Sequence, residues 1–481
     1  MKAPRIAVVG GGIAGLAAAT ILTERGASAH VFEREASFGG RLRSWPMTLS
    51  DGTTLQMERG FHAFFRQYYN LRALMRRWDP TLASLRPLDD YPILGPDGVR
   101  MRFDRLPKRS PWNIAAVALR GGKWLGLSGL AGIDVRQALL MLAWDERLWA
   151  TLDGMTAAEF LDGLRFPPEA RRMLFDVFAH SFFNPEGAMS AAELLMMFHF
   201  YFTGNPEGLV FDVLRDAFEP SFVRPWTTHL SRAGVALSPG TTIGRLAREG
   251  AAFTVDGERF DGLVLATDVG GLRALTLDSD VLDPIDRARV ATLDVTAPFV
   301  VHRLWLDRPT REREPFVGTA GLGHLDNISC FHTFEAESAA WAARTGGSVV
   351  ELHAYGVEAL GSPEREAALK AELVGHLHAL YPETRQARVL DEAWLVRQDC
   401  PAFAPGSRAT RPGVETRTPG VALAGDFVAL PFPSALMERA ATSGILAANA
   451  VLTALGRGGR DEPVRSIPRR GLLAPLSRWL G

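Results

Sequence analysis

The chain has 481 residues, which is long for one hydrophobic core, so we expect two domains or a discontinuous pair. Hydrophobic residues make up 47% and charged residues 22% of it, which is typical of a folded globular protein and excludes the disordered and fibrous classes. The net charge of -1 gives no reason to expect nucleic acid, and two isolated cysteines, Cys330 and Cys400, predict neither a disulfide framework nor a metal site.

The first forty residues predict a strand, a helix and a second strand. Residues 6–9 form a short apolar strand, residues 16–25 have the small and apolar residues of a packed helix, and the second strand ends at Glu33. The turn before the helix has the G-x-G-x-x-G spacing, and its residues are Gly10, Gly12, Ile13, Ala14 and Gly15.

Each glycine of this turn has its own physical role. Gly10 permits the tight turn, and Gly12 lets the backbone approach a pyrophosphate at the positive end of the helix. Gly15 allows close contact between helix and strand. Glu33, about 20 residues further on, can accept hydrogen bonds from a ribose. This arrangement favours dinucleotide binding over the alternative, a glycine-rich turn without a ligand.

Arg34 and the run Gly39-Gly40-Arg41 follow, where an NAD enzyme would begin its next helix. The run resembles the second signature of the flavoproteins that include amine oxidases and phytoene desaturases. In that group the glycine pair and the arginine lie along the FAD diphosphate. The resemblance implies an α/β fold with a Rossmann-type FAD-binding domain and an inserted α+β substrate domain. The alternative is a flexible loop with a solvated arginine.

The stretch RGFHAFFRQYYN, residues 59–70, concentrates aromatic residues. Positions 61, 64, 65, 68 and 69 have the spacing of one helical face, so we predict a helix, with His62, Arg66 and Asn70 on the neighbouring row. Two interpretations remain open. The stretch is a core helix, or it borders the flavin ring, where the resemblance places Gly60, Phe61 and His62.

The remaining FAD-binding segments lie far along the chain. Residues 234–269 predict strands that return to the FAD domain, and the resemblance places the backbone of Val235 against the adenine. Near the C-terminus a strand at 421–424 precedes Gly425, Asp426 and a helix. This resembles the C-terminal flavin motif, which implies non-covalent FAD whose ribityl chain or diphosphate lies near Asp426. The start of that helix, directed at the flavin, contains Ala435, Leu436 and Met437.

These segments predict a discontinuous arrangement of domains. The FAD-binding domain comprises residues 1–75, 222–275 and 410–460, and the substrate domain comprises 76–221 and 276–409. Residues 461–481 form a basic and apolar tail.

The aromatic stretch and the sequence LPFPSALMERAATSG together resemble the isorenieratene synthase family. Members desaturate a carotene and shift a methyl group, so that a β-ionone ring becomes an aromatic φ-ring. Two alternatives remain. One is a flavin-dependent desaturase or amine oxidase of the same fold with another isoprenoid or amine substrate. The other is a non-enzymatic binding protein like the GDP-dissociation inhibitors.

The implied chemistry needs apolar walls, ring faces that stabilise a cation, little water and a base. We predict that Phe65 and Tyr68 supply ring faces, and that His62 and Glu58 are the candidates for proton removal. A histidine here can equally well hydrogen-bond backbone or flavin.

An apolar carotenoid substrate raises the question of delivery. Residues 111–133 and the arginine-rich tail have the composition of interfacial segments, so we expect peripheral membrane contact. The two isolated cysteines fit a reducing cytoplasm, so we expect a cytoplasmic protein. The alternatives are a buried helix pair for the first segment and a disordered end for the second. The sequence does not predict an oligomeric state.

Overall fold

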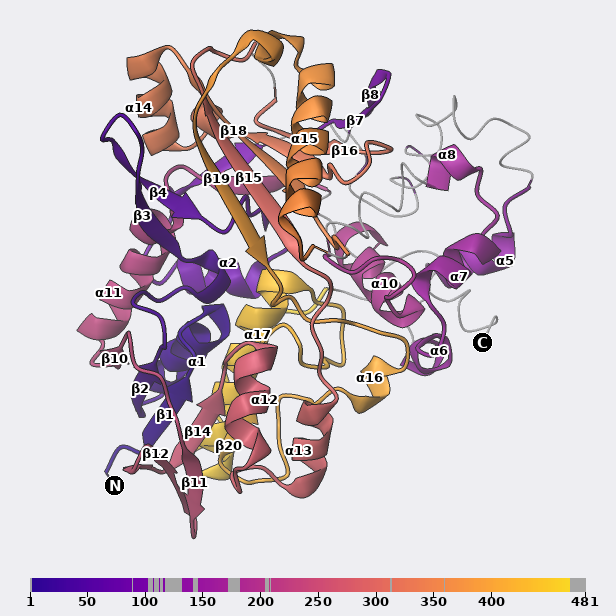
Figure 1. Ribbon diagram of the computed structural model, residues 1–481. Coiled ribbons are helices and arrows are strands. Elements are labelled where there is room, and N and C mark those ends of the chain that lie inside the picture. The colour runs from indigo at the N-terminus through magenta and orange to yellow at the C-terminus, as the bar shows by residue number, and fades with distance from the viewer. Residues whose placement is uncertain are drawn as a thin grey trace.

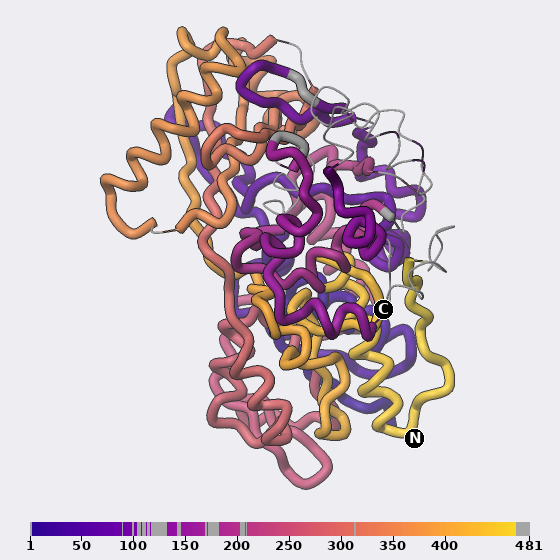
Figure 2. Tube along the Cα trace, turned by 90° about the vertical axis from the view of Figure 1, so that its right-hand side faces the viewer, coloured from indigo at the N-terminus to yellow at the C-terminus, as the bar shows by residue number. Residues whose placement is uncertain are grey.

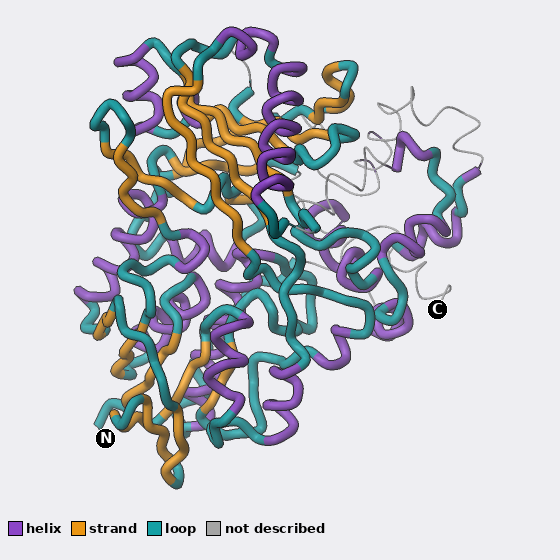
Figure 3. Tube along the Cα trace, viewed as in Figure 1, coloured by secondary structure: helices purple, strands orange, loops and turns teal. Residues whose placement is uncertain are grey.

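The computed structural model describes residues 2–467, except 89, 103–106, 108–111, 113–115, 117–131, 142–145, 172–181, 204–206, 208, 312–313 and 359. Two sheets dominate the molecule (Figure 1). One lies close to the N-terminus and the other, made of longer strands, lies at the opposite end (Figure 3). A lobe of short helices projects to one side of the region between them (Figure 1).

The first sheet is parallel and has five strands. In spatial order they are β10 (Ala236–Ser238), β2 (Ser28–Phe32), β1 (Arg5–Val9), β14 (Gly262–Leu265) and β20 (Val421–Leu423), each pair parallel. Three separated parts of the chain therefore build one sheet. This is the arrangement that a discontinuous FAD domain requires, while the exact domain boundaries stay a prediction.

Two buried helices, α1 (Ile13–Glu24) and α17 (Leu436–Ala454), cross on this sheet. A Cβ atom on Gly444 of α17 would lie only 2.2 Å from the carbonyl oxygen of Ala14, so glycine is what lets the helices approach so closely. The same region contains β11 (Leu246–Glu249), β12 (Ala252–Val255), β13 (Glu258–Phe260), α11 (Arg224–Arg232), α12 (Val269–Leu277) and α13 (Pro284–Ala291).

The second sheet has seven strands. In spatial order they are β19 (Val389–Arg397), β15 (Phe299–Leu306), β18 (Ser348–Ala354), β17 (Asn327–Cys330), β16 (Phe316–Thr319), β7 (Ile93–Gly95) and β8 (Gly98–Met101). Helix α15 (Pro363–Leu380) packs on one face through Leu369, Leu373 and Leu377, which share a core with Leu352 of β18. Side chains alternate along a strand, so Glu351 and His353 project toward the other face.

The remaining elements connect and flank the two sheets. Around the second sheet and between the two lie β3 (Ser44–Thr48), β4 (Thr54–Glu58), β5 (Phe64–Phe65), α2 (Tyr69–Met75), β6 (Leu85–Leu88), β9 (Phe211–Leu214) and α14 (Ala336–Thr345). The lobe contains α5 (Val135–Leu140), α6 (Glu146–Leu152), α7 (Ala157–Gly163), α8 (Pro168–Arg171), α10 (Ala191–Phe198) and α16 (Ser407–Thr410), and it faces the viewer in Figure 2. Short 3-10 or π turns occupy Gly40–Leu42, His199–Thr203, Glu219–Val223, Phe331–Thr333 and Pro382–Gln386.

The prediction of one helix over residues 59–70 is wrong. Gly60 has a φ of 100°, which a helix cannot contain, and Phe64 and Phe65 form β5, paired with β9. Helix α2 begins only at Tyr69. The predicted aromatic face and the adjacent polar row of His62, Arg66 and Asn70 are therefore not helical faces.

Both segments proposed for membrane contact lie mainly outside the described residues. Of residues 111–133 the structure describes only four, and it describes nothing beyond residue 467. Among the helices that it does describe, none has the length and apolar character needed to cross a bilayer.

Candidate functional site

A cavity of about 530 Å³ is lined by residues from both sheets and from the loops between them. The turn after β1 lines one end, and aromatic side chains line the other. Its wall includes these predicted site residues: Gly10, Gly12, Ile13, Ala14, Glu33, Arg34, Gly39, Gly40, Arg41, Phe61, His62, Phe65, Tyr68, Gly425, Asp426, Leu436 and Met437.

Close packing explains the glycines at the first end. A Cβ atom on Gly10 would lie 2.4 Å from the carbonyl oxygen of Ala266, and one on Gly15 would lie 1.9 Å from the carbonyl oxygen of Gly10. Gly12 differs, because the nearest atom to its Cβ would be 3.8 Å away. The space beside Gly12 is thus open toward the cavity, as a diphosphate requires.

Glu33 is buried directly after β2 and orders this end of the cavity. One carboxylate oxygen accepts from the Gly11 N–H at 2.8 Å and the other from the Glu35 N–H at 2.9 Å. Each oxygen keeps a further lone pair for a ribose hydroxyl. The neighbouring Arg34 pairs with Asp268, with a distance of 2.8 Å between its Nη2 and the carboxylate.

Two helices begin at the cavity without a capping side chain. The N-cap residues are Gly12 for α1 and Ala435 for α17, and neither offers a side-chain hydrogen bond to the first turn. Free N–H groups and the helix dipole make both ends favourable for anions and for electron-rich atoms. An extended FAD, with its diphosphate at α1 and its flavin at α17, therefore fits the residues present.

The middle of the cavity carries the Arg41–Asp426 ion pair, with 2.5 Å between Nη2 and Oδ1. The same guanidinium lies 3.9 Å from the Sγ of Cys400, which also lines the cavity. Burial raises the pKa of Cys400 to about 12, so this residue is a neutral thiol near neutral pH. Cys400 was not predicted at this position, since it lies outside the predicted FAD segments.

Aromatic rings wall the other end. The ring of Phe61 stacks on Phe316 with 4.5 Å between centroids, and Phe65 contacts Tyr201 edge-on at 4.8 Å. The hydroxyls of Tyr68 and Tyr201 are 2.9 Å apart. Although residues 61–68 are not a helix, Phe61, Phe65 and Tyr68 all line the cavity.

His62 lies on the cavity wall with a defined tautomer. Its Nδ1 is 2.8 Å from the carbonyl oxygen of Gly60, which can only accept, so Nδ1 carries the proton and Nε2 has a free lone pair. Burial lowers the pKa of His62 to about 4, so the imidazole is neutral near pH 7. The ring packs edge-on against Phe218 at 5.2 Å.

Glu58 does not face this cavity, so the expectation that it acts as a base is corrected. It lines a small separate pocket, and its carboxylate accepts from the Phe218 N–H at 2.7 Å. Burial raises the pKa of Glu58 to about 8, with partial compensation by Arg303 at 3.7 Å. A carboxyl that keeps its proton at pH 7 cannot accept another.

Other predicted positions support the wall rather than form it. Val235 does not line the cavity, and its N–H donates to the carbonyl of Leu230 at 3.0 Å. Residues 241–244 line it in place of Val235, and the Thr241 N–H donates to the Glu33 carbonyl at 2.7 Å. Gly15, Gly60 and Ala435 are also behind the wall.

Sequence reasoning missed several wall residues in the substrate-side region. These are Arg59, Phe183, Asp326, Asn327, His353, Tyr355 and Asp399. The only available signal was the alternation of Glu351, His353 and Tyr355 along an otherwise apolar segment, which predicts one polar face of a strand.

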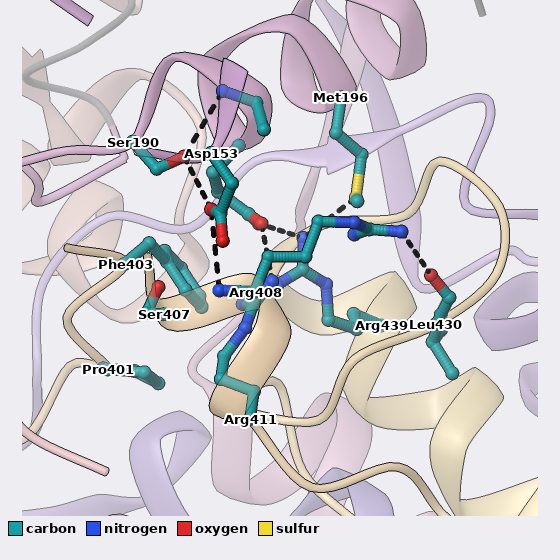
Figure 4. A network of polar contacts seen from close by, with 12 residues as sticks. Asp153, Ser190, Met196, Pro401, Phe403, Ser407, Arg408, Arg411, Leu430 and Arg439 are labelled. Atoms are coloured by element: carbon teal, nitrogen blue, oxygen red, sulfur yellow. Dashed lines mark hydrogen bonds and ion pairs between the residues drawn. The ribbon is translucent and has the colours of Figure 1, made fainter. Parts of the chain in front are cut away.

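A buried ion cluster fixes the start of α17 beside the cavity. Arg439 of α17 pairs with Glu193 of α10, and Arg411 donates to the same carboxylate at 2.7 Å. Burial alone raises the pKa of Glu193, but the two arginines lower it to about 2. Figure 4 shows Arg439 beside Arg411 and directed at Met196. Because the cluster joins α17 to the lobe, it positions Leu436 and Met437.

Comparison with known proteins shows which family has this fold. Residues 13–452 match the family model described as flavin containing amine oxidoreductase. A carotenoid phi-ring synthase from Streptomyces griseus is 47% identical, with 99% of this chain and 92% of that protein covered. Another from Chlorobaculum tepidum is 26% identical, with 97% and 91% covered. A solved structure of a redesigned putrescine oxidase superposes with a TM-score of 0.66 at 17% identity, over 94% of this chain and 99% of that one.

The chain therefore belongs to the flavin-containing amine oxidoreductase family, and it is an FAD-dependent oxidoreductase. The resemblance to carotenoid ring-aromatising enzymes is confirmed by the two phi-ring synthases, which match nearly the whole chain. Within the family, this chain belongs with the carotenoid phi-ring synthases.

Proposed function

We propose that this flavoenzyme desaturates a carotenoid such as β-carotene and aromatises its β-ionone ring with a methyl shift, to give a φ-ring carotenoid such as isorenieratene. One observation carries the proposal. A single cavity joins a dinucleotide cradle at Gly10, Gly12 and Glu33 to an end walled by aromatic rings. The 47% identity to a carotenoid phi-ring synthase supports the same assignment.

The reaction has one chemical obstacle that the residues must address. The ring carries two methyl groups on one quaternary carbon, so it cannot become aromatic until one of them migrates. Bound FAD supplies the hydride acceptor. Loss of hydride from the ring leaves a cation, the methyl group migrates, and a proton leaves. After an external electron acceptor has reoxidised the flavin, a second oxidation with loss of hydride and a proton completes the aromatic ring.

The aromatic wall is suited to the cationic stage. The faces of Phe65 and Tyr68 are electron-rich, and a cation held against such a face is stabilised by about 1–2 kcal/mol in a dry site. The rings also exclude water, which would otherwise trap the cation as an alcohol. We propose that Phe61, stacked on Phe316, closes the wall.

His62 is suited to accept one of the protons. Its Nε2 has no hydrogen-bond partner among the described residues, and its Nδ1–H is anchored on Gly60. The low pKa of His62 makes it a weak base, but a cation that aromatises by losing a proton is a strong acid. A weak, neutral acceptor is sufficient for such a step.

Production in a host that accumulates β-carotene tests the function. We expect new carotenoids with one or two aromatic end rings, identified by mass and by absorption spectrum. Asp426→Ala, which removes the partner of Arg41 at the cavity, is the matched control and should form little product. Unchanged β-carotene beside a folded, FAD-loaded wild-type enzyme would contradict the proposal.

We propose in addition that the protein takes its substrate from a membrane surface. The support is the composition of residues 111–133 and of the tail, which combine tryptophans, leucines and arginines. The full-length protein should co-sediment with anionic liposomes at low salt and be partly released at high salt. Deletion of residues 465–481 should reduce binding, and a wild-type protein that stays in the supernatant would refute the contact.

A further inference from the structure

We infer that Tyr355, His353 and Glu351 form a proton-accepting relay at the aromatic end of the cavity, with Tyr355 as the group that takes a proton from the substrate. The inference rests on the proposed function and deepens it. Aromatisation of one ring removes two hydrides and two protons. Each proton needs an acceptor, and His62 accounts for one of them.

The relay follows from strand geometry. Glu351 and His353 occupy alternate positions of β18 and Tyr355 follows directly after it, so the three share one side of the strand. The register of the sheet sets their neighbours. Arg303 of β15 lies opposite Glu351, and Asn327 of β17 lies opposite His353.

Hydrogen bonds link the three side chains in order. The Tyr355 hydroxyl is 2.6 Å from Nδ1 of His353, and Nε2 of His353 is 2.6 Å from the Glu351 carboxylate. The series of hydrogen bonds ends at Arg303, whose Nε donates to the other carboxylate oxygen of Glu351 at 2.7 Å.

The partners determine where each hydrogen lies. Glu351 is ionised, because Arg303 and His353 outweigh the effect of burial and lower its pKa to about 2, so Nε2 of His353 must donate to it. Asn327 donates to the Tyr355 oxygen at 2.9 Å, and the tyrosine proton therefore points at Nδ1 of His353. Burial raises the pKa of Tyr355 well above its usual value, so the phenol is protonated near pH 7.

This order of donors allows one balanced proton transfer. A C–H bond of the ring cation breaks, its electron pair becomes a ring double bond, and the proton moves to the Tyr355 oxygen. At the same time the phenolic proton moves to Nδ1 of His353. The imidazolium that forms is held by the Glu351 carboxylate, and it releases a proton to water after the product leaves. Tyr355 thus ends as a neutral phenol without passing through a phenolate.

The relay is built together with the aromatic wall. His353 and Tyr355 line the cavity, and the Tyr355 ring contacts Phe183 at 4.6 Å. The Phe61 N–H donates to Glu351 at 2.8 Å. A Cβ atom on Gly60 would lie 2.8 Å from Cε1 of His353, so the glycine makes room for the imidazole. If the Glu351–Arg303 ion pair were purely structural, it would not need a hydrogen-bonded tyrosine, Tyr355, on the cavity wall.

Tyr355→Phe is the direct test, because it removes only the hydroxyl. We expect the rate of aromatic product formation to fall at least about 100-fold, the size of a lost general base. Flavin content and thermal midpoint should stay close to those of wild type. Tyr381→Phe is the matched control, since it removes a buried hydroxyl from a tyrosine that does not line the cavity, and it should leave the rate unchanged.

A double-variant cycle tests whether the residues act in one relay. His353→Gln and Tyr355→Phe should each slow the reaction, and the double variant should be no slower than the worse single variant. Independent structural effects would multiply instead, and that result would overturn the relay. His353→Gln should also remove the strongly downfield proton resonance expected for the short His353–Glu351 hydrogen bond.

The outcomes separate the relay from the function. A wild-type enzyme that forms no aromatic ring would overturn both. A wild type that aromatises the ring, beside a Tyr355→Phe variant that is equally fast, would overturn the relay alone.

Discussion

Arg41 and Asp426 are 385 positions apart in the chain, yet their side chains form an ion pair of 2.5 Å on the wall of the central cavity. The pair joins the second glycine motif to the strand–turn before α17. It therefore marks the place where the N-terminal and C-terminal FAD segments meet. The substitutions below separate the cofactor end of this cavity from the substrate end.

Glu33→Ala should weaken FAD retention by about 1–3 kcal/mol, the value of a hydrogen bond to a charged group. Part of this loss is indirect, since Glu33 also accepts from the Gly11 and Glu35 N–H groups. FAD affinity can be measured by equilibrium titration of the deflavinated protein. Unchanged affinity would remove Glu33 from the ribose-binding role.

Gly12→Ala and Gly15→Ala should fail in different ways. At Gly12 the new methyl group meets no protein atom closer than 3.8 Å, so stability should stay constant while FAD affinity falls. At Gly15 it would overlap the Gly10 carbonyl, so we expect a loss of about 1–3 kcal/mol in unfolding free energy.

Gly375→Ala provides the control for this pair. Gly375 is exposed in the middle of α15 with no atom near its Cβ position, and alanine should add up to about 1 kcal/mol there. Denaturant unfolding and flavin absorbance measure the two quantities. Equal FAD affinity of Gly12→Ala and wild type would show that no diphosphate packs on Gly12.

Glu58→Gln tests the buried carboxyl through the pH dependence of stability. The folded pKa of about 8 lies above the ordinary value of 4.5, so the neutral carboxyl contributes fully below pH 4.5. That contribution is lost as the pH rises toward 8, at a rate of up to about 1.4 kcal/mol per pH unit. Glutamine keeps the acceptor for Phe218 and cannot ionise. The unfolding free energy of the variant should therefore rise relative to that of wild type between pH 5 and pH 8. Parallel curves of stability against pH would refute the raised pKa.

His62→Gln keeps a hydrogen-bonding group but cannot take up a proton near neutral pH. We expect hydride transfer to continue and a partly desaturated, unaromatised ring to accumulate, because one proton acceptor is missing. Chromatography of the carotenoids from reactions with an added electron acceptor, run for many turnovers beside wild type, resolves that species. Wild-type yields of aromatic product would assign His62 to packing alone.

The cofactor end could be predicted because its signals are local. Gly15 and Glu33 act on atoms close to them in the βαβ unit, the Gly10 carbonyl and the Gly11 N–H, so spacing alone carries the information. The adenine contact of Val235 stays a prediction, but Val235 does not line the cavity and its N–H donates to the Leu230 carbonyl, a detail of the helix end before β10. The neighbouring residues 241–244 have no motif that would have singled them out.

The substrate end depends on pairing between distant strands, which periodicity does not encode. The helical spacing of residues 61–69 was overridden by the left-handed backbone at Gly60 and by the pairing of Phe65 with Phe211. Likewise the role of His353 depends on Asn327 and Glu351, and the first of these comes from another strand. The aromatic composition nevertheless indicated the segment that lines the cavity, residues 61–68, although its backbone is not the predicted helix.

Phe65→Leu and Tyr68→Leu test whether that aromatic wall stabilises a cation or only fills space. Leucine retains apolar bulk, so the loss in unfolding free energy should be less than about 1.5 kcal/mol for Phe65. Loss of a ring face worth about 1–2 kcal/mol should slow product formation by about 5- to 30-fold, with FAD still bound. Tyr68→Leu also breaks the hydrogen bond to Tyr201, so Tyr68→Phe is needed to separate the ring from the hydroxyl. The phenylalanine variant should retain most of the activity.

Phe253→Leu is the control for these changes, because Phe253 is as buried as Tyr68 but lies in β12 away from the cavity. It should lose stability without a loss of rate per folded, FAD-loaded molecule. Rates are therefore compared at equal flavin content, against thermal midpoints measured on the same samples. If Phe65→Leu and Tyr68→Leu lose rate only in proportion to lost folding, as Phe253→Leu would, then these rings are core and the cation is stabilised elsewhere.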